Sequence, residues 1–206
     1  MRSRPVYGLL ALLLVGAALM RGVLATAGAG TPATAGTAST LPGLLIGPAP
    51  WGRNASVLGA RLARLGLPAL AREGTVLHIH EHLDLLVDGK RVTVPAGIGI
   101  DAAGLFISPI HTHDTTGIIH VESPFVRRFT LGEFFGVWGV RFNRDCLGGY
   151  CSGNGKELRV YVDGRLRRGD PRDIALTPHE EIAVVYGRAN GHGARVPRSF
   201  AFPLGY

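Results

Sequence analysis

Hydrophobic and polar residues alternate between residues 76 and 87, and this spacing of two predicts a half-buried β-strand. Its apolar face carries Leu77, Ile79, Leu83, Leu85 and Val87, and its polar face carries His78, His80, His82 and Asp84. Glu81 interrupts the apolar face. Asp88 and Gly89 then provide a hairpin turn ahead of residues 91–95. We therefore expect three histidines side by side on one face of a strand.

A second hairpin is predicted further along the chain. Residues 105–113 and 118–123 are both strand-like, and the four residues between them, Asp114-Thr-Thr-Gly117, are typical of a turn. The two segments are therefore expected to pair in antiparallel fashion, with residues 114–117 as the loop.

The register of this hairpin brings further histidines together. His111 falls opposite His120, and His113 falls opposite Ile118. Opposed residues of an antiparallel pair have Cβ atoms roughly 4.5 to 5.5 Å apart on the same face. We therefore expect His111, His113 and His120 to converge on one side, with Glu122 next along that side.

Two segments have helical rather than alternating patterns. Residues 54–65 place apolar residues on one helical face, and Gly66 and Pro68 follow as stop signals. Residues 129–140 begin with the capping-box sequence Thr130-Leu-Gly-Glu133, and the apolar residues after it are spaced for core packing. The sequence thus predicts two short helices.

The last part of the chain returns to strands. Residues 157–168, with a turn at Asp163-Gly164, and residues 181–187 are both strand-like. Together with the segments above, they predict an α+β fold that is mainly antiparallel β, with short hairpins and one or two short helices. Such an arrangement would be a small sandwich or barrel-like structure.

The N-terminal segment predicts export. A basic start precedes an uncharged apolar run at residues 6–20, and small residues follow, which is the layout of a secretory signal. Arg21 directly after the run also suits a retained membrane anchor, so residues 1–27 are predicted to be either a signal peptide or an anchor. We expect the product to be at the cell surface, periplasmic or secreted.

A linker and one folded domain are expected to follow. Residues 28–50 consist mainly of Ala, Gly, Thr and Pro and carry no charge, which predicts a flexible linker. Residues 51–206 are then a single exported domain.

Composition narrows the possible partners. The formal net charge is +7, and part of the excess lies in the N-terminal segment. No basic stripe with interleaved aromatic residues supports nucleic-acid binding, so no nucleic-acid partner is expected. Cys146 and Cys151 are the only cysteines, and in an oxidising compartment a disulfide is favoured over a metal thiolate pair.

The histidines point to a metal ion as the main ligand. Six of the eight histidines fall within residues 78–120, and imidazole is the commonest metal-ligating side chain. The candidate ligands are His78, His80, His82, His111, His113 and His120. Both methionines lie in the N-terminal segment, so histidine and carboxylate donors favour Zn(II) or Cu(II), with Fe(II) as a third option. The competing interpretation is a solvated stripe of surface histidines.

Several of the motifs resemble a group of exported bacterial proteins. They are His-x-His-x-His-Leu at residues 78–83, the segments 94–100 and 111–124, and Thr-Leu-Gly-Glu-Phe-Phe-Gly-Val-Trp-Gly at residues 130–139. The resemblance covers most of residues 76–206. It implies export and brings no known activity with it.

Two functions follow from the predicted metal site. The first is an exported or membrane-tethered binding module that captures a metal ion for sensing, storage or delivery. The second is an enzyme in which His111, His113 and His120 hold a metal that activates water. Its general base would be Glu122, Asp114 or Glu81. A third interpretation, a surface domain that uses histidine as a pH switch, rests on the histidine count alone.

Overall fold

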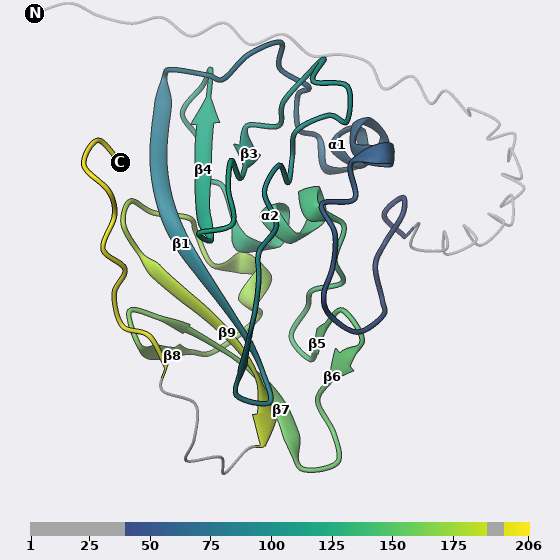
Figure 1. Cartoon of the computed structure of the whole chain (residues 1–206), viewed down its shortest axis with the longest axis vertical. Coiled ribbons are helices and arrows are strands. Elements are labelled where there is room, and N and C mark those ends of the chain that lie inside the picture. Colours follow the sequence, from purple (N-terminus) through teal and green to yellow (C-terminus); the bar gives the residue numbers. More distant parts are fainter. Residues whose placement is uncertain (1–39, 189–195) are drawn as a thin grey trace, which may run out of the picture. The chain divides into compact units, whose positions relative to one another are not determined.

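The computed structural model describes residues 40–188 and 196–206, and these form a curled, mainly antiparallel sheet with two short α-helices (Figure 1). The strands are β1 (Leu77–Val87), β2 (Lys90–Val92), β3 (Ile110–His111), β4 (Ile118–Ser123), β5 (Cys146–Leu147), β6 (Tyr150–Cys151), β7 (Lys156–Val162), β8 (Arg165–Arg167) and β9 (Glu181–Arg188). The helices are α1 (Leu58–Leu65) and α2 (Leu131–Trp138), with short 3-10 turns η1 (Ala55–Val57) and η2 (Pro171–Asp173). The predicted α+β class is confirmed.

Seven strands make up the main sheet, in the order β3-β4-β1-β9-β7-β8 with β2 also paired to β1. All pairs are antiparallel except β1 with β9. The long strand β1 changes neighbours along one edge, because residues 77–82 pair with β4 and residues 85–87 pair with β2. The predicted turn at Asp88 and Gly89 is present, and both residues have positive φ angles, as a two-residue hairpin loop requires.

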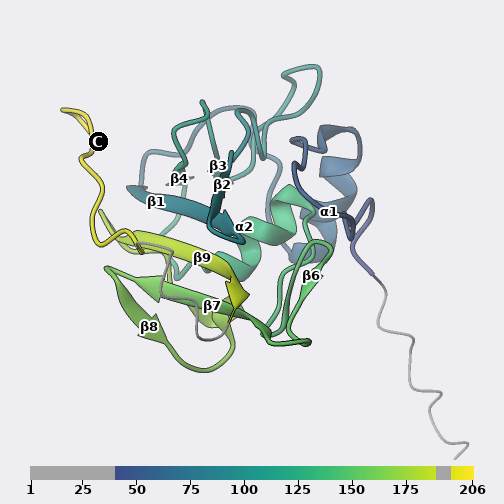
Figure 2. The same cartoon turned by 60° about the horizontal axis from the view of Figure 1, so that its bottom comes forward.

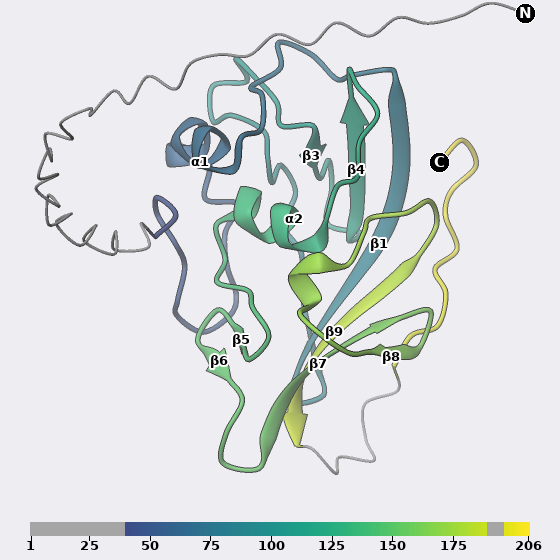
Figure 3. The same ribbon diagram turned by 180° about the vertical axis from the view of Figure 1, so that it is seen from behind.

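One face of the sheet packs against the helices. Figures 2 and 3 show α2 along this face, with α1 beyond it. Phe134, Phe135 and Trp138 of α2 are almost completely buried and join Ile119 and Val121 of β4 in the core. The capping box predicted at the start of this helix is formed by both of its hydrogen bonds. The aromatic residues of α2 therefore pack in the hydrophobic core.

The other face of β1 and β9 is covered in part by residues 196–206, the yellow segment beside β1 in Figure 1. Val196 packs against a small cluster formed by Leu86, Ala183 and Val185. Further along, Phe200 stacks on the ring of His82 with 3.7 Å between ring centroids. This face carries the histidines of β1.

The folded part includes residues that the sequence analysis assigns to the linker. Leu45 donates its backbone N–H to Gly139 O and accepts a hydrogen bond from Arg141 N. Gly47 O accepts a backbone hydrogen bond from Gly149 N. Backbone pairing of this kind requires no charged or bulky side chain, so the composition of this segment did not reveal it. The predicted signal or anchor and residues 28–39 of the predicted linker lie outside the described residues.

Two further features complete the fold. The predicted disulfide between Cys146 and Cys151 is present and joins β5 to β6. Within residues 40–188 and 196–206, no helix has the length and apolar character needed to cross a bilayer.

Candidate metal centre

Strand register brings the histidines together on one face of β3, β4 and β1. His111 pairs with His120, as predicted from the hairpin, and His120 pairs in turn with His80 of β1. The next pair along the same two strands is Glu122 with His78. Residues two apart on a strand point to the same face, so these side chains all project to the side away from α2. The predicted pairing of His111 with His120 is confirmed, whereas β3 ends at His111 and the predicted pair of His113 with Ile118 is not among the observed pairs.

The first potential metal-binding group contains His111, His113, His120 and Glu122. Each contributes one ligand atom, and these atoms all lie within 4.8 Å of one another. The Nε2 atoms of His111 and His113 are 3.1 Å apart. His111 and His120 are buried, whereas the side chain of His113 is 40% exposed. The group is thus closed on the inside and reachable from solvent at His113.

His111 is held in the form that a metal ion needs. Its Nδ1–H donates to the carbonyl oxygen of Ser108 at 3.0 Å, which leaves the lone pair on Nε2. Burial lowers the pKa of His111 to about 3. A neutral imidazole with a fixed tautomer is the state that binds a metal ion.

A second group contains His78, His80 and Glu122. The Nε2 atoms of the two histidines are 3.1 Å apart, and His78 Nε2 is 3.2 Å from Glu122 Oε1. Burial, together with the neighbouring imidazoles, lowers the pKa of His80 to about 4. The side chain of His78 is 53% exposed, so this group opens to solvent.

Glu122 belongs to both groups and is an ionised carboxylate. Burial by itself would raise its pKa, but the hydrogen bond with His120 and the nearby His111 and His78 outweigh this and lower the pKa to about 2. Its Oε1 lies 3.2 Å from His120 Nδ1, and its Oε2 lies 3.9 Å from His111 Nε2. Such a carboxylate is a good metal ligand and a poor general base.

His82 falls outside the groups formed by the other five candidate histidine ligands and is grouped instead with Asp84 and Glu181. Its Nδ1 is 2.6 Å from Glu181 Oε2, and its Nε2 is 2.9 Å from the carbonyl oxygen of Thr116. Asp84 forms an ion pair with Arg91. Because both nitrogens of His82 already have protein partners, this residue fits an internal polar network better than an open metal site.

The other two candidate bases, Asp114 and Glu81, do not belong to either of these two groups of ligand atoms. Asp114 opens the turn and accepts hydrogen bonds from the backbone N–H and hydroxyl of Thr116; this hydroxyl contact lowers its pKa. Glu81 pairs with Ile119, so strand alternation directs its side chain to the core face. Glu81 therefore does not face the converging histidines, whereas Asp114 is close enough to His120 and His113 for them to contribute to its lowered pKa.

Glu81 is a buried acid without a hydrogen-bond partner among the described residues. It is 0% exposed, and both carboxylate oxygens are unsatisfied. Burial, with a smaller contribution from Glu180, raises its pKa well above the usual value. Neutral Glu81 therefore contributes stability below a pH of about 4.5, and that stability is lost as the pH rises toward the folded-state pKa.

We expect Glu81→Met to raise the free energy of unfolding at pH 8 by about 1 kcal/mol, because the variant buries no unsatisfied carboxyl group. The gain should shrink as the pH is lowered toward 5. Urea unfolding of metal-free protein at both pH values measures it. Glu157→Met, at an exposed position of β7, is the matched control and should change stability little. A Glu81→Met variant less stable than wild type at pH 8 would contradict this account.

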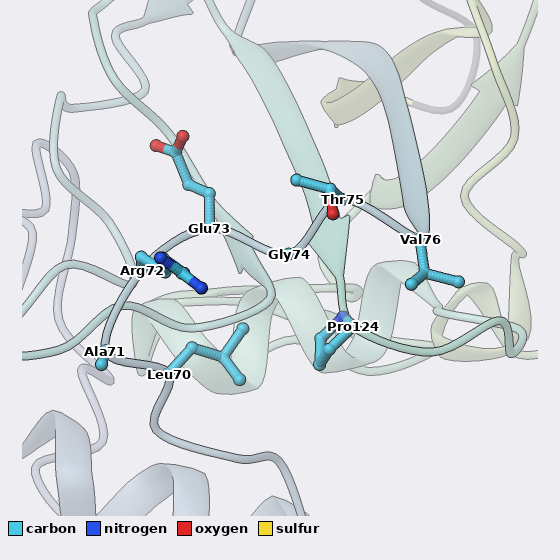
Figure 4. A pocket seen from close by; sticks show the side chains of 8 residues that line it. All are labelled: Leu70, Ala71, Arg72, Glu73, Gly74, Thr75, Val76 and Pro124. Atoms are coloured by element: carbon cyan, nitrogen blue, oxygen red, sulfur yellow. The ribbon is translucent and has the colours of Figure 1, made fainter.

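Glu73 is a site residue that the sequence analysis missed. Its Oε1 lies 3.2 Å from His113 Nε2 and 3.9 Å from His111 Nε2. Glu73 lines a pocket of about 580 Å³ formed by residues 70–76 and Pro124 (Figure 4). A single Glu in a loop 38 residues before His111 has no local pattern that would mark it.

Tyr206 packs over two of the buried histidines, His80 and His120. The Tyr206 ring lies 4.7 Å from the His80 ring and 5.6 Å from the His120 ring, measured between centroids. His179 Nε2 is 3.0 Å from Tyr206 O, so His179 supports this segment and belongs to none of the groups of ligand atoms. His192 lies outside the described residues.

Comparison with known protein families, curated proteins and solved structures finds no match to this chain. The function is therefore argued from the site itself.

Proposed function

We propose that this protein is an exported or membrane-tethered module that binds Cu(II) or Zn(II) for capture, sensing or delivery. Its primary site would be formed by His111, His113 and His120, with Glu122 as a carboxylate ligand. The N-terminal segment would carry the domain out of the cytoplasm or hold it at the membrane.

The observation that carries this proposal is the convergence of three imidazoles and a carboxylate from β3, β4 and the turn after β3. A solvated stripe would leave the rings apart and hydrated, because each neutral imidazole can be satisfied by water. Here His111 and His120 are instead buried, and Glu122 is buried beside them. Burying these imidazole nitrogens costs folding free energy, and a metal ion bound by all of them would offset that cost.

The donor set favours the proposed metals. Imidazole nitrogens with one carboxylate oxygen suit Zn(II) and Cu(II), and Fe(II) is accommodated by the same donors. The two cysteines are joined in a disulfide, so they supply no thiolate. Glu73, within reach of His113, would be an exchangeable further ligand at the solvent side.

Elemental analysis tests the proposal. We expect the purified protein, loaded with Zn(II) or Cu(II) and dialysed, to retain at least one ion per chain. The triple variant His111→Ala, His113→Ala, His120→Ala should lose the primary ion, with affinity reduced at least about 100-fold, because no carboxylate alone replaces three imidazoles. Circular dichroism would show that the variant is folded.

The control is His179→Ala, which removes a histidine outside the ligand groups. It should retain as much metal as the wild type. Equal and substoichiometric metal in the wild type and the triple variant would reject the metal-binding function.

A metal-dependent hydrolytic enzyme is the second candidate, and the observation that favours it is Glu73. Three histidines can hold a metal whose bound water has a pKa near neutrality. Glu73 is 47% exposed at the side chain and lies beside a pocket and beside His113. It would replace Glu122, Asp114 and Glu81 as the general base of such an enzyme.

A further inference from the structure

We propose that the protein holds two metal ions side by side, with Glu122 as the ligand that they share. This inference rests on the proposed metal-binding function and specifies its stoichiometry. The first ion would be held by His111, His113 and His120, and the second by His78 and His80.

The histidines form two separate pairs with the same geometry. In each pair the two Nε2 atoms are 3.1 Å apart, between His111 and His113 and between His78 and His80. Two nitrogens bound to one ion at 2.0 to 2.1 Å with tetrahedral angles would lie about 3.3 Å apart. Each pair therefore has nearly the spacing of two ligands on a common ion.

A single ion cannot serve both pairs. Any two ligand atoms of one ion lie at most about 4.2 Å apart, which is twice the metal–nitrogen distance. The five histidines and Glu122 supply two groups of ligand atoms. Within each group all atoms lie within 4.8 Å of one another, and only Glu122 belongs to both groups. The pairs also come from strands on opposite sides of β4, the strand that carries Glu122.

Glu122 is placed to join the two ions. Its Oε1 lies 3.2 Å from His78 Nε2 in the second group, and its Oε2 lies 3.9 Å from His111 Nε2 in the first group. Because Oε1 is also 3.2 Å from His120 Nδ1, this oxygen lies between the two groups, and Oε2 faces the first group. Carboxylate-bridged ions lie about 3.5 to 4 Å apart, and the negative charge offsets part of their repulsion.

The two ions would differ in exposure. The first has three histidines and is closed on the inside by His111 and His120, which are buried. The second has two histidines, and the His78 side chain is 53% exposed. We therefore expect the second ion to bind more weakly and to exchange with solvent, which is the behaviour that delivery to a partner requires.

Titration with Cu(II), followed by equilibrium dialysis and electron paramagnetic resonance, tests the inference on the full chain. We expect two Cu(II) per chain in the wild type, with dipolar broadening and a half-field transition because the two ions lie within about 4 Å. His78→Ala with His80→Ala should bind one Cu(II) with an ordinary isolated spectrum. Glu122→Gln should weaken the second ion at least tenfold and reduce the coupling.

Controls and contrary results separate this inference from the metal-binding function. Glu157→Gln, at an exposed position of β7, is the control for Glu122→Gln and should keep two coupled ions. One Cu(II) in both the wild type and the His78/His80 double variant would overturn the second site and leave metal binding intact. Two Cu(II) retained in the double variant, or two ions in the wild type without coupling, would overturn the shared centre. Absence of Cu(II) binding in the wild type would reject both proposals.

Discussion

We expect metal-free wild-type protein to lose about 3 kcal/mol of unfolding free energy between pH 6.5 and pH 4 through His111 alone. Burial lowers the folded-state pKa of this residue to about 3, whereas the unfolded chain has a pKa near 6.5. Between these values the unfolded state takes up a proton that the folded state does not. The contribution of neutral His111 to the free energy of unfolding is therefore fully present above pH 6.5. It falls by about 1.4 kcal/mol for each pH unit between pH 6.5 and the folded-state pKa.

The measurement is urea unfolding in the presence of a chelator at pH 6.5, 5 and 4, comparing the wild type with His111→Asn. The variant lacks the titrating ring, so its stability should fall by about 3 kcal/mol less over the same range. Groups that do not interact with His111 titrate equally in both proteins and cancel in the difference, whereas Glu122, whose pKa His111 helps to lower, contributes to it. Parallel curves for wild type and His111→Asn would show that His111 is not kept neutral by burial.

Gly74→Ala should destabilise the protein by about 3 kcal/mol or more and weaken metal binding with it. A Cβ at this position would meet Ser123 C at 2.1 Å and Pro124 N at 2.3 Å. These are backbone atoms at the end of β4, so no side chain can move aside. The contact is close because Gly74 N–H donates to Glu122 O, which ties the Glu73 loop to the strand that carries Glu122.

Gly52→Ala is the matched control, because a Cβ there has no heavy atom within 4 Å and the residue does not have a positive φ angle. Chemical denaturation and Cu(II) affinity should both remain near wild type in this variant. If the Gly74→Ala variant proved as stable as the Gly52→Ala variant, this result would contradict the close contact between Gly74 and the end of β4.

The local part of the site could be predicted from the sequence. Residues 114–117 contain a recognisable turn, and once it is placed, strand pairing fixes His111 opposite His120 and Glu122 two residues further on. The same holds for the Asp88-Gly89 hairpin and for the capping box of α2. In each case the determining residues lie within a few positions of one another.

The rest of the site could not be predicted, because it depends on pairing between strands that are distant in the sequence. The pairing of β1 with β4 sets His80 beside His120, and the parallel pairing of β1 with β9 brings Glu181 to His82, 99 residues away. The pairing of β1 with β9 gives His82 a carboxylate partner, Glu181. His82 therefore does not join His78 and His80, the other two histidines of β1, in their group. Glu73 reaches the site only because Gly74 lies against β4.

The dependence of the site on strand register has an evolutionary consequence. Glu122 and His120 are separated by a core residue, Val121, so insertion or deletion of one residue in β4 would turn the carboxylate inward and the valine outward. Insertion or deletion of two residues would leave each side chain of β4 on its present face of the sheet. Functional descendants of this sequence should therefore conserve the residue spacing within β4.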